Sequence, residues 1–165
     1  MLPLQEKGTL MRKVLFVRPS LCVNCRICEM ACSLAKTGRF NPVQSRIWIH
    51  QNEDGTDLPN TCRHCLWPPC EKACPVKGEK AIYQDKQTGI VYISSKDCLG
   101  CYDCVRACPF DAIRISAGED QVFKCDLCEG DPECAKWCPT ESIKYVEQSL
   151  IGTLSAVDRN LPYAG

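Results

Sequence analysis

Residues 98–109 read CLGCYDCVRACP, in which two residues separate each of the first three cysteines and a fourth cysteine stands directly before a proline. Residues 22–32, CVNCRICEMAC, repeat the spacing, but Ser33 replaces the proline. A wider middle gap marks residues 62–75, CRHCLWPPCEKACP, and residues 125–139, CDLCEGDPECAKWCP. These four motifs contain all 16 cysteines of the 165-residue chain, so cysteine chemistry dominates this sequence.

Composition narrows what the thiols can do. Cysteine makes up a large part of the 45% hydrophobic residues, which leaves little apolar side-chain area for an ordinary core. Lys+Arg and Asp+Glu number 20 each, so no basic excess points to nucleic acid or an anionic membrane. No apolar stretch reaches the ~20 residues of a membrane helix, and the N-terminus shows no export signal. We therefore expect a cytoplasmic protein whose thiols bind metal, since disulfides are rare in that reducing compartment.

The spacing suits an iron-sulfur cluster better than a single ion. Three thiolates on one short loop can reach neighbouring irons of a [4Fe-4S] cluster, while the cysteine before proline reaches a different cluster. Structural zinc is the alternative, but its sites usually consist of two CxxC pairs separated by a spacer. The sequence thus predicts four [4Fe-4S] clusters. Because four cysteines are available for each, no iron is left open for substrate, which favours electron transfer without a catalytic site.

The quartets resemble those of bacterial-type ferredoxins, and the order of the four motifs is similar to that of four-cluster polyferredoxin subunits in multi-subunit oxidoreductases. The resemblance covers residues 13–146. It implies an electron-transfer subunit beside a larger catalytic subunit, as in enzymes of the DMSO reductase, formate dehydrogenase, formate hydrogenlyase and carbon monoxide dehydrogenase kind. A tungsten- or molybdenum-pterin partner is favoured by this analogy, with a tungsten aldehyde oxidoreductase as the specific candidate.

Further partners and two other functions stay open at this point. A flavin subunit or a ferredoxin would meet the far end of a row of clusters. Head-to-tail self-association is a further hypothesis, because a linear row with both ends at the surface could repeat from chain to chain. The alternatives are an independent soluble polyferredoxin shuttle and, more remotely, a zinc-bound interaction protein.

The segments between the motifs predict the fold class. AIY with IVYIS in residues 81–94, and AIRI with QVF in residues 112–123, are typical of short hairpins. The strands expected over residues 13–17 and 142–146 have no neighbour in sequence, and they can pair with each other if one ferredoxin module encloses a second. We therefore predict an α+β fold of two bacterial-ferredoxin-like modules, with short antiparallel hairpins and short helices, one nested inside the other.

Nesting divides the chain and pairs the motifs. The outer module takes residues 13–33 and 115–147, the inner module takes residues 62–114, residues 34–61 are an insertion, and residues 148–165 are a C-terminal tail. In the outer module, which also follows the four-cluster family pattern, cluster A is assigned to Cys22, Cys25, Cys28 and Cys138, and cluster B to Cys125, Cys128, Cys134 and Cys32. In the inner module, cluster C is assigned to Cys62, Cys65, Cys70 and Cys108, and cluster D to Cys98, Cys101, Cys104 and Cys74. A tandem pairing of first with second and third with fourth motif is the alternative, disfavoured because residues 33–60 show no clear hairpin.

Several residues outside the ligand set carry expectations of their own. RIWIH at residues 46–50 predicts an edge strand in the insertion, and the tail lacks a sustained apolar period, so we expect it to be extended. His64 is expected to donate an N–H near a cluster rather than to ligate iron. Trp67 and Trp137 are expected to shield sulfides from water. The cations in or beside the motifs, which could offset cluster charge, are Arg26, Arg63, Lys72, Arg106, Lys124 and Lys136.

Overall fold

The computed structural model describes residues 12–53, 55–76, 80–116 and 121–159. Over these residues the chain is α+β, with short antiparallel strand pairs and short helices. The strands are β1 (Lys13–Val17), β2 (Ile47–Gln51), β3 (Asp57–Thr61), β4 (Ile82–Gln84), β5 (Val91–Ile93), β6 (Arg114–Ile115), β7 (Val122–Phe123) and β8 (Ile143–Glu147). The helices are α1 (Ile27–Thr37), α2 (Pro69–Ala73), α3 (Asp103–Ala107), α4 (Glu133–Lys136) and α5 (Ile151–Arg159), with 3-10 turns at Pro19–Leu21, Pro42–Gln44, Leu127–Gly130 and Gln148–Leu150.

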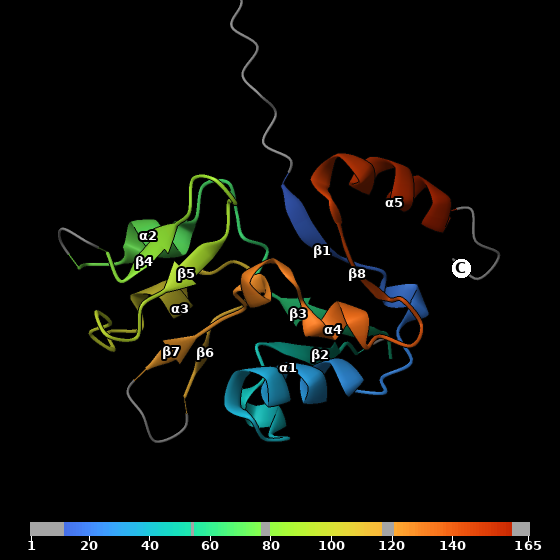
Figure 1. The fold of residues 1–165 in the computed structure, drawn as a ribbon, viewed down its shortest axis with the longest axis horizontal. Helices are drawn as coiled ribbons and strands as arrows, with labels where there is room; N and C mark the ends of the chain where they lie inside the picture. The colour runs from blue at the N-terminus through green and yellow to red at the C-terminus, as the bar shows by residue number, and fades with distance from the viewer. Residues whose placement is uncertain (1–11, 54, 77–79, 117–120, 160–165) are drawn as a thin grey trace, which may run out of the picture.

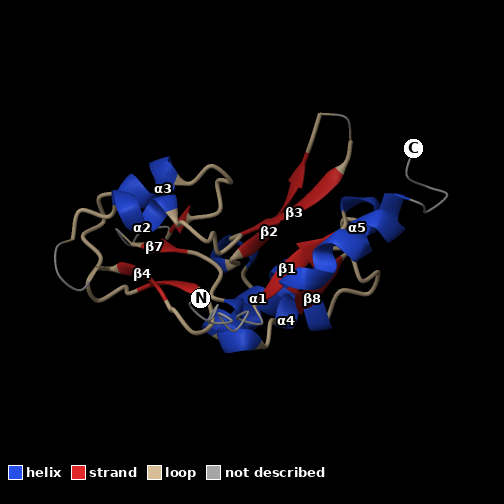
Figure 2. Cartoon of the chain, turned by 90° about the horizontal axis from the view of Figure 1, so that it is seen from above, coloured by secondary structure: helices blue, strands red, loops and turns tan. Residues whose placement is uncertain are grey.

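These elements form two lobes that lie side by side in both ribbon views (Figure 1, Figure 2). The central lobe contains α2, β4, β5, α3, β6 and β7, which come from the middle of the chain. The terminal lobe contains β1, α1, β2, β3, α4, β8 and α5, which come from its two ends. Elements far apart in sequence therefore share the terminal lobe.

Strands from the two ends of the described chain pair directly. β1 and β8 are antiparallel, with Lys13 opposite Glu147 and Val17 opposite Ile143. Both strands carry the β-branched and aromatic residues that favour a pleated, half-buried surface. Leu15 and Ile143 are turned into the core, with exposed fractions of 8% and 2%. The pairing predicted for these two segments is present in the structure.

The helices of the motifs pack in two pairs. α1 of the first motif contacts α4 of the fourth, and α2 of the second motif contacts α3 of the third. α1 continues beyond residue 33 and ends where Gly38 adopts a left-handed φ of 71°, the usual glycine device for closing a helix. Cys28 and Cys32 lie one turn apart on its buried face.

Both hairpins predicted between the motifs are present. β4 pairs with β5 and β6 with β7, each antiparallel. The β4–β5 turn is closed by the Asp85 carboxylate, which accepts the backbone N–H groups of Gln87 and Thr88 at 2.7 Å each. Gly89 ends this turn with a φ of +72°. A non-glycine residue there would be strained.

The insertion contradicts the expectation that residues 33–60 hold no clear hairpin. β2 and β3 form an antiparallel hairpin, with Ile49 opposite Pro59. Pro59 lacks an N–H and lowered the strand signal of DLPNT, but a two-stranded sheet has only edge strands, where proline is tolerated. The N–H of Ile49 donates to the buried carboxylate of Glu29 at 2.7 Å, which attaches β2 to α1.

The tail also differs from the expectation of an extended segment. A 3-10 turn at Gln148–Leu150 leads into the helix α5. Nine residues span too few turns for an apolar period to be read in the sequence. Residues 160–165 and residues 1–11, on which the expectation about export rests, lie outside the described residues. In the part of the chain that is described, no helix has the length and apolar character needed to span a membrane.

Thiols are built into the core of both lobes. In the terminal lobe, Cys28, Cys32, Cys125 and Cys134 pack with buried aliphatic residues such as Ile47 and Leu127. In the central lobe, Cys70 and Cys104 pack with residues such as Val91 and Ile113. The aliphatic side chains alone make only small clusters, as the composition predicts.

Candidate iron-sulfur cluster sites

Every motif bends its backbone in the same place. The residue two positions after the first cysteine has a left-handed φ in all four motifs: Asn24 at 52°, His64 at 45°, Gly100 at 66° and Leu127 at 57°. Such a turn points successive N–H groups to one side and makes a small concavity that favours an anion. Three of the four residues are not glycine, so the surrounding motif must hold them against a local preference for negative φ.

Backbone N–H groups already reach cysteine sulfurs in these turns. The N–H of His64 donates to Sγ of Cys62 at 3.4 Å, and the N–H of Leu127 donates to Sγ of Cys125 at 3.3 Å. The last cysteine of two motifs also accepts a backbone hydrogen bond. The N–H of Ala112 donates to Sγ of Cys108, and the N–H of Arg46 donates to Sγ of Cys32, both at 3.3 Å. Each of these bonds favours a negatively charged sulfur, which is the form that ligates metal.

Three pockets are each lined by four thiols from two motifs. The first motif and the last cysteine of the fourth line one pocket, with Cys22, Cys25, Cys28 and Cys138. The second motif and the last cysteine of the third line another, with Cys62, Cys65, Cys70 and Cys108. The third motif and the last cysteine of the second line the remaining one, with Cys74, Cys98, Cys101 and Cys104.

The fourth quartet lies in a buried part of the terminal lobe, together with the last cysteine of the first motif. Burial raises the pKa of Cys134 well above its usual value, and its thiol neighbours Cys125, Cys32, Cys28 and Cys128 raise it further. Cys32, from the first motif, is therefore close to the cysteines of the fourth. The set Cys125, Cys128, Cys134 and Cys32 shares one buried region of the terminal lobe.

These thiol sets fit the donor chemistry of a [4Fe-4S] cluster, which takes four cysteine sulfurs. The thiols of each pocket surround a space instead of meeting at one point: within the described ranges, no three His, Cys, Asp or Glu side chains are close enough to hold a single metal ion. All sixteen cysteines are free thiols. The donors, their number and their spread around each pocket agree with a polynuclear centre.

Burial keeps the thiols protonated when nothing is bound to them. It raises the pKa of Cys28 and Cys125 to about 12, and that of Cys70 and Cys104 to about 11. Ligation must therefore release protons from buried thiols, and it removes the repulsion among the thiolates of one set. Cluster binding and folding are coupled in such a site.

Two pairs of interacting cysteines connect the thiol sets. Cys134 of the fourth motif interacts with Cys28 of the first. Cys125 of the fourth motif interacts with Cys62 of the second, across the boundary between the lobes. Since α2 also packs on α3, the thiol sets form a continuous series through the molecule.

An ion network covers the fourth motif from the side of the insertion. Asp126 receives the ammonium of Lys36 at 2.8 Å and the guanidinium of Arg46, and its carboxylate also accepts the N–H of Cys128 at 3.0 Å. Burial raises the pKa of Asp126, but the hydrogen bond from Lys36 and the charge of Arg46 outweigh burial and lower it overall. The network links α1 and the start of β2 to the residue that follows Cys125.

The structure corrects the expectation for the tryptophans and extends that for the cations. The side chains of Trp67 and Trp137 are 79% and 62% exposed, and neither lines any of the three thiol pockets. Among the motif cations, Lys124 is buried and lines the pocket of Cys62, Cys65, Cys70 and Cys108. Arg12 was missed, because it stands ten residues before the first motif and carries no sequence signal for this site.

Comparison with known proteins agrees with this chemistry. Residues 54–148, which hold three of the four motifs, match the family model described as a 4Fe-4S dicluster domain. The chain belongs to the 4Fe-4S dicluster domain family. The predicted iron-sulfur character of the motifs is thereby confirmed.

Two relatives of this chain are named as enzyme subunits. The chain is 40% identical over 124 residues to the aliphatic sulfonate oxidoreductase polyferredoxin-like subunit of Pyrococcus furiosus, covering 75% of this chain and 70% of the relative. It is 30% identical over 162 residues to the formate dehydrogenase-O iron-sulfur subunit of Escherichia coli, covering 82% of this chain but only 53% of the relative. It therefore spans about half the length of that relative.

Among solved structures, a chain of the active-site complex BamBC of benzoyl coenzyme A reductase is 23% identical, with a TM-score of 0.48 and 90% of each chain covered.

Proposed function

We propose that this protein is the iron-sulfur electron-transfer subunit of an oxidoreductase complex. In this proposal four [4Fe-4S] clusters relay single electrons between a catalytic subunit and a second redox partner. The observation that carries the proposal is the gathering of three cysteines of one motif with the last cysteine of another around each of three pockets. That grouping matches the ligand exchange of two-cluster ferredoxin modules.

The nested arrangement of two modules is part of this proposal. The antiparallel pairing of β1 with β8 and the packing of α1 on α4 support an outer module of residues 13–33 and 115–147. The packing of α2 on α3 supports an inner module of residues 62–114. Residues 34–61 then add the β2–β3 hairpin to the outer module, and residues 148–165 follow it.

The ligand sets follow from the same grouping. We assign cluster A to Cys22, Cys25, Cys28 and Cys138, and cluster B to Cys125, Cys128, Cys134 and Cys32. We assign cluster C to Cys62, Cys65, Cys70 and Cys108, and cluster D to Cys98, Cys101, Cys104 and Cys74. The thiol neighbours Cys134–Cys28 and Cys125–Cys62 support the spatial order A, B, C, D.

When bound, a [4Fe-4S] cluster gains and loses one electron, so a two-electron reaction in a partner is divided into single steps. The residues of this chain supply the surroundings. The motif turns donate N–H groups to ligating sulfurs, as His64 does to Cys62 and Leu127 to Cys125. Buried aliphatic residues such as Ile49 and Ile143 keep water from the thiols of cluster A. With four thiols for each cluster, we propose no catalytic site in this chain.

A catalytic subunit is proposed as the main partner because the relatives are named as subunits of oxidoreductases. A tungsten- or molybdenum-pterin enzyme is the proposed class, with an aldehyde oxidoreductase as the specific candidate. A flavin subunit, a ferredoxin or a second copy of this chain is proposed for the other end of the series. A cytoplasmic location belongs to the same proposal, since sixteen thiols need a reducing compartment before clusters are inserted.

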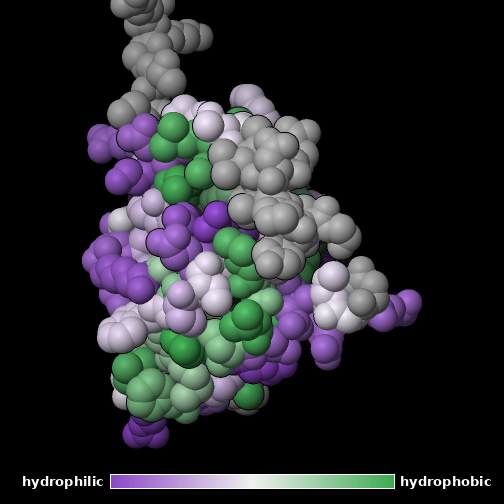
Figure 3. Space-filling view, turned by 90° about the vertical axis from the view of Figure 1, so that its right-hand side faces the viewer, coloured by the Kyte–Doolittle hydropathy of each residue, from purple (hydrophilic) through white to green (hydrophobic). Residues whose placement is uncertain are grey.

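Exposed apolar side chains support the proposal that this chain binds a partner subunit. Large apolar side chains are exposed around the motifs, among them Val23 at 64%, Trp67 at 79% and Leu99 at 71%. Apolar patches stand out between hydrophilic regions on the side of the terminal lobe (Figure 3). A groove between α1 and α4 is lined by Ile27, Met30, Ala31, Leu34, Ala35, Phe40, Glu133 and Trp137. Exposed apolar areas of this kind mark interaction surfaces.

The test is anaerobic purification of the tagged full-length chain from its native host, followed by metal analysis and mass spectrometry of what co-purifies. We expect about sixteen iron and sixteen acid-labile sulfide atoms per chain and a larger partner containing tungsten or molybdenum. A brown protein without a partner that reduces unrelated acceptors would favour the independent shuttle. A colourless protein containing zinc would overturn the proposal.

A further inference from the structure

Three buried nitrogen-bearing side chains meet where the two lobes join. Arg12, His64 and Lys124 are 7%, 2% and 4% exposed. Arg12 precedes β1, His64 belongs to the second motif, and Lys124 directly precedes Cys125 of the fourth motif. The charges of Lys124 and Arg12 both act on His64, which places the three side chains together. We call these three residues the junction.

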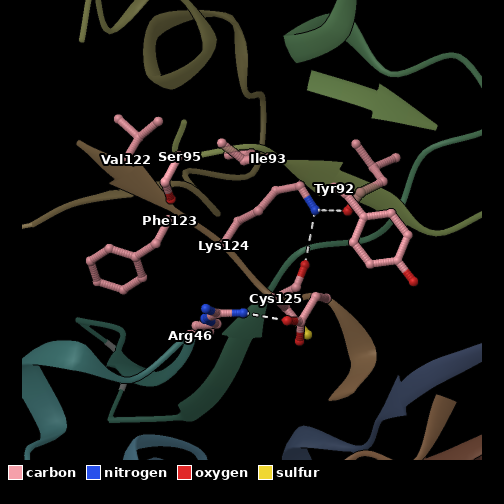
Figure 4. Close-up of a pocket in the computed structure, with 10 residues that line it drawn as sticks. Arg46, Tyr92, Ile93, Ser95, Val122, Phe123, Lys124 and Cys125 are labelled. Carbon is pink, nitrogen blue, oxygen red and sulfur yellow. Dashed lines mark hydrogen bonds and ion pairs between the residues drawn. The ribbon is translucent and has the colours of Figure 1, made fainter. Parts of the chain in front are cut away.

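Lys124 connects the lobes at the junction. Its Nζ donates to the carbonyl of Cys125 at 2.9 Å and to the carbonyl of Val91 in β5. Figure 4 shows the side chain extended between β5 and Cys125. Lys124 also lines the pocket assigned to cluster C. Its positive charge acts on Cys70 of that set and on Cys125 of the cluster B set.

Arg12 reaches the same place from the terminal lobe. Its carbonyl accepts the N–H of Gln148 at 2.8 Å, which holds the backbone at the end of the β1–β8 sheet. Its side chain passes Gly89 in the central lobe, where an added Cβ would be 3.0 Å from Nε. The guanidinium interacts with Cys65 and Cys62. Its buried Nη2 has no hydrogen-bond partner in the described part of the chain.

His64 contributes a hydrogen-bond donor, and the tautomer of its ring is determined by a bond from the backbone. Its Nδ1 accepts the backbone N–H of Val91 at 3.0 Å, so the single proton of the neutral ring is on Nε2. That Nε2 is buried and lacks a partner among the described residues. The imidazole therefore offers one N–H to a group that the protein chain itself does not supply.

Burial of these three side chains costs free energy unless an anion lies beside them. Neither Arg12 nor Lys124 is paired with a carboxylate within the ranges the structure describes, and buried cations and donors without partners are strongly disfavoured. A [4Fe-4S] core in the 2+ state with four thiolates carries a net charge of about −2. Arg12 interacts with Cys65 and Cys62. Lys124 lines the pocket of the same set, so the junction adjoins the thiols assigned to cluster C.

Among the described residues, the other cations beside the thiol sets are at least partly exposed or have a carboxylate partner, although Lys124 itself also acts on Cys125 of the cluster B set. Arg18, before the first motif, has a side chain that is 12% exposed and lies 4.0 Å from the carboxylate of Glu141. Near clusters A and D, the side chains of Arg26 and Arg106 are 57% and 68% exposed, so water and salt screen their charges.

Near cluster B, Lys36 and Arg46 share the single carboxylate of Asp126, and their side chains are 16% and 25% exposed, so the remaining positive charge is partly screened by water. The buried cations Arg12 and Lys124, which lack a carboxylate partner among the described residues, therefore lie beside cluster C, and Lys124 also borders cluster B.

We propose that the junction of Arg12, His64 and Lys124 gives cluster C the highest midpoint potential of the four, so that the first electron entering the protein resides there. This inference rests on the ligand set proposed above. Positive charge and N–H donors stabilise the reduced cluster, which is one unit more negative than the oxidised one. Because cluster C lies between cluster B and cluster D in the proposed order, the junction divides the relay into two halves at the lobe boundary.

The experiment is a redox titration of the holoprotein followed by electron paramagnetic resonance, with iron and sulfide measured on the same samples. In Arg12→Gln we expect the highest midpoint potential to fall and the other three to stay. In Lys124→Gln we expect the highest potential to fall most, with a smaller fall for cluster B, because Lys124 also acts on Cys125. The glutamine in Lys124→Gln can still donate to backbone carbonyls, so the change isolates the charge. The control is Arg39→Gln, an exposed arginine outside the motifs, for which we expect no change in potential.

Three further variants separate charge and hydrogen bonding from packing. Arg12→Lys keeps the charge and should recover most of the shift, and His64→Gln, which can accept one bond and donate another, should shift the potential less than His64→Leu. If Arg12→Gln loses iron but Arg12→Lys retains it, the charge is needed to hold the cluster, which supports the proposal. Iron loss that Arg12→Lys does not reverse would show a packing role and overturn it.

The failure of this inference is distinct from the failure of the proposed function. Four clusters per chain with a highest potential that neither Arg12→Gln nor Lys124→Gln changes would overturn the junction alone. Fewer than four clusters in the unmodified protein would overturn the proposed function, whatever the variants do.

Discussion

Gly89 lies directly against the side chain of Arg12: a Cβ at Gly89 would stand 3.0 Å from Nε and 3.1 Å from Cδ of that arginine. Gly89 belongs to the β4–β5 turn of the central lobe, and Arg12 precedes β1 of the terminal lobe. The absence of a side chain at Gly89 therefore lets a cation from the start of the described chain reach thiols in the middle of it.

Gly89→Ala should destabilise the protein for two reasons: the backbone at residue 89 would be strained, and the new Cβ would press against Arg12. The φ of +72° at Gly89 disfavours alanine by about 1 kcal/mol, and displacement of Arg12 adds to this. Gly38→Ala is the matched control, because Gly38 has a φ of +71° and nothing within 4 Å of the added Cβ. We expect a lower temperature of cluster loss, followed by visible absorbance, for Gly89→Ala than for Gly38→Ala. Equal temperatures would mean that Arg12 gives way at no cost.

The pairing of motifs can be tested with the last cysteines. In the nested arrangement, Cys138→Ser changes the paramagnetic signal of the cluster that also changes in Cys22→Ser, since both belong to cluster A. In a tandem arrangement, Cys138→Ser would instead change the cluster that responds to Cys98→Ser. Electron paramagnetic resonance of the reduced proteins distinguishes the two. Cys32→Ser and Cys125→Ser, both in cluster B, form the second matched pair.

Removal of iron should unfold the chain. The buried thiols and the small aliphatic clusters leave too little apolar area for an independent core, and metal binding then supplies the folding free energy. We expect a chelator under reducing conditions to abolish most of the circular dichroism of both lobes, and iron with sulfide to restore it. A chelated protein that keeps native dichroism would contradict this view.

Substitution of a residue that has a left-handed φ in a motif turn should destabilise the protein. Asn24 has a φ of 52°, where a β-branched residue is strained, so Asn24→Val should cost about 1–3 kcal/mol and reduce iron retention. Asn24→Gly relieves the strain and serves as the comparison, although it removes the hydrogen bond from Asn24 to Asp57, 3.0 Å long. Iron content after gel filtration measures the effect. The result would speak against the shared turn if both variants retained iron equally.

Asp126 should give the protein a pH-dependent component of stability. Its pKa is lowered in the folded state, because Lys36 and Arg46 outweigh the effect of burial. A lowered pKa stabilises the fold above the pKa of the unfolded state, about 3.9, and this contribution is lost as the pH falls through the folded value. Asp126→Asn should therefore accelerate cluster loss at pH 7, relative to the parent protein, and this difference should shrink only when the pH falls below about 4.

A matched control for Asp126→Asn is available on the surface. Glu141 pairs with Lys144 at 2.7 Å, but its side chain is 67% exposed, and exposed pairs contribute little. Glu141→Gln should leave the rate of cluster loss nearly unchanged at both pH values. An equal effect of the two variants would show that the Asp126 network is no more than a solvated ion pair.

Much of this protein follows from short-range sequence. The CxxC spacings, the turns between AIY and IVYIS and between AIRI and QVF, and the strand character of KVLFV are local patterns, and the structure contains the corresponding elements. The β2–β3 hairpin escaped prediction because Pro59 and its polar neighbours weaken the local strand signal, while the bond from Ile49 to Glu29 that stabilises it spans twenty residues. The helix α5 escaped because it is short.

The sequence by itself determined the chemistry: sixteen thiols in four spaced motifs specify iron-sulfur ligation, because the local turn places three sulfurs on one side of a loop. Tertiary structure alone decided which distant groups share a site. Arg12 meets Cys62, and Cys32 meets Cys134, only because β1 pairs with β8 and α1 packs on α4. The spacing of a motif determines only the structure of a short loop. Charge and burial depend on residues that are close in space, and such residues can be far apart in the sequence and show no local pattern.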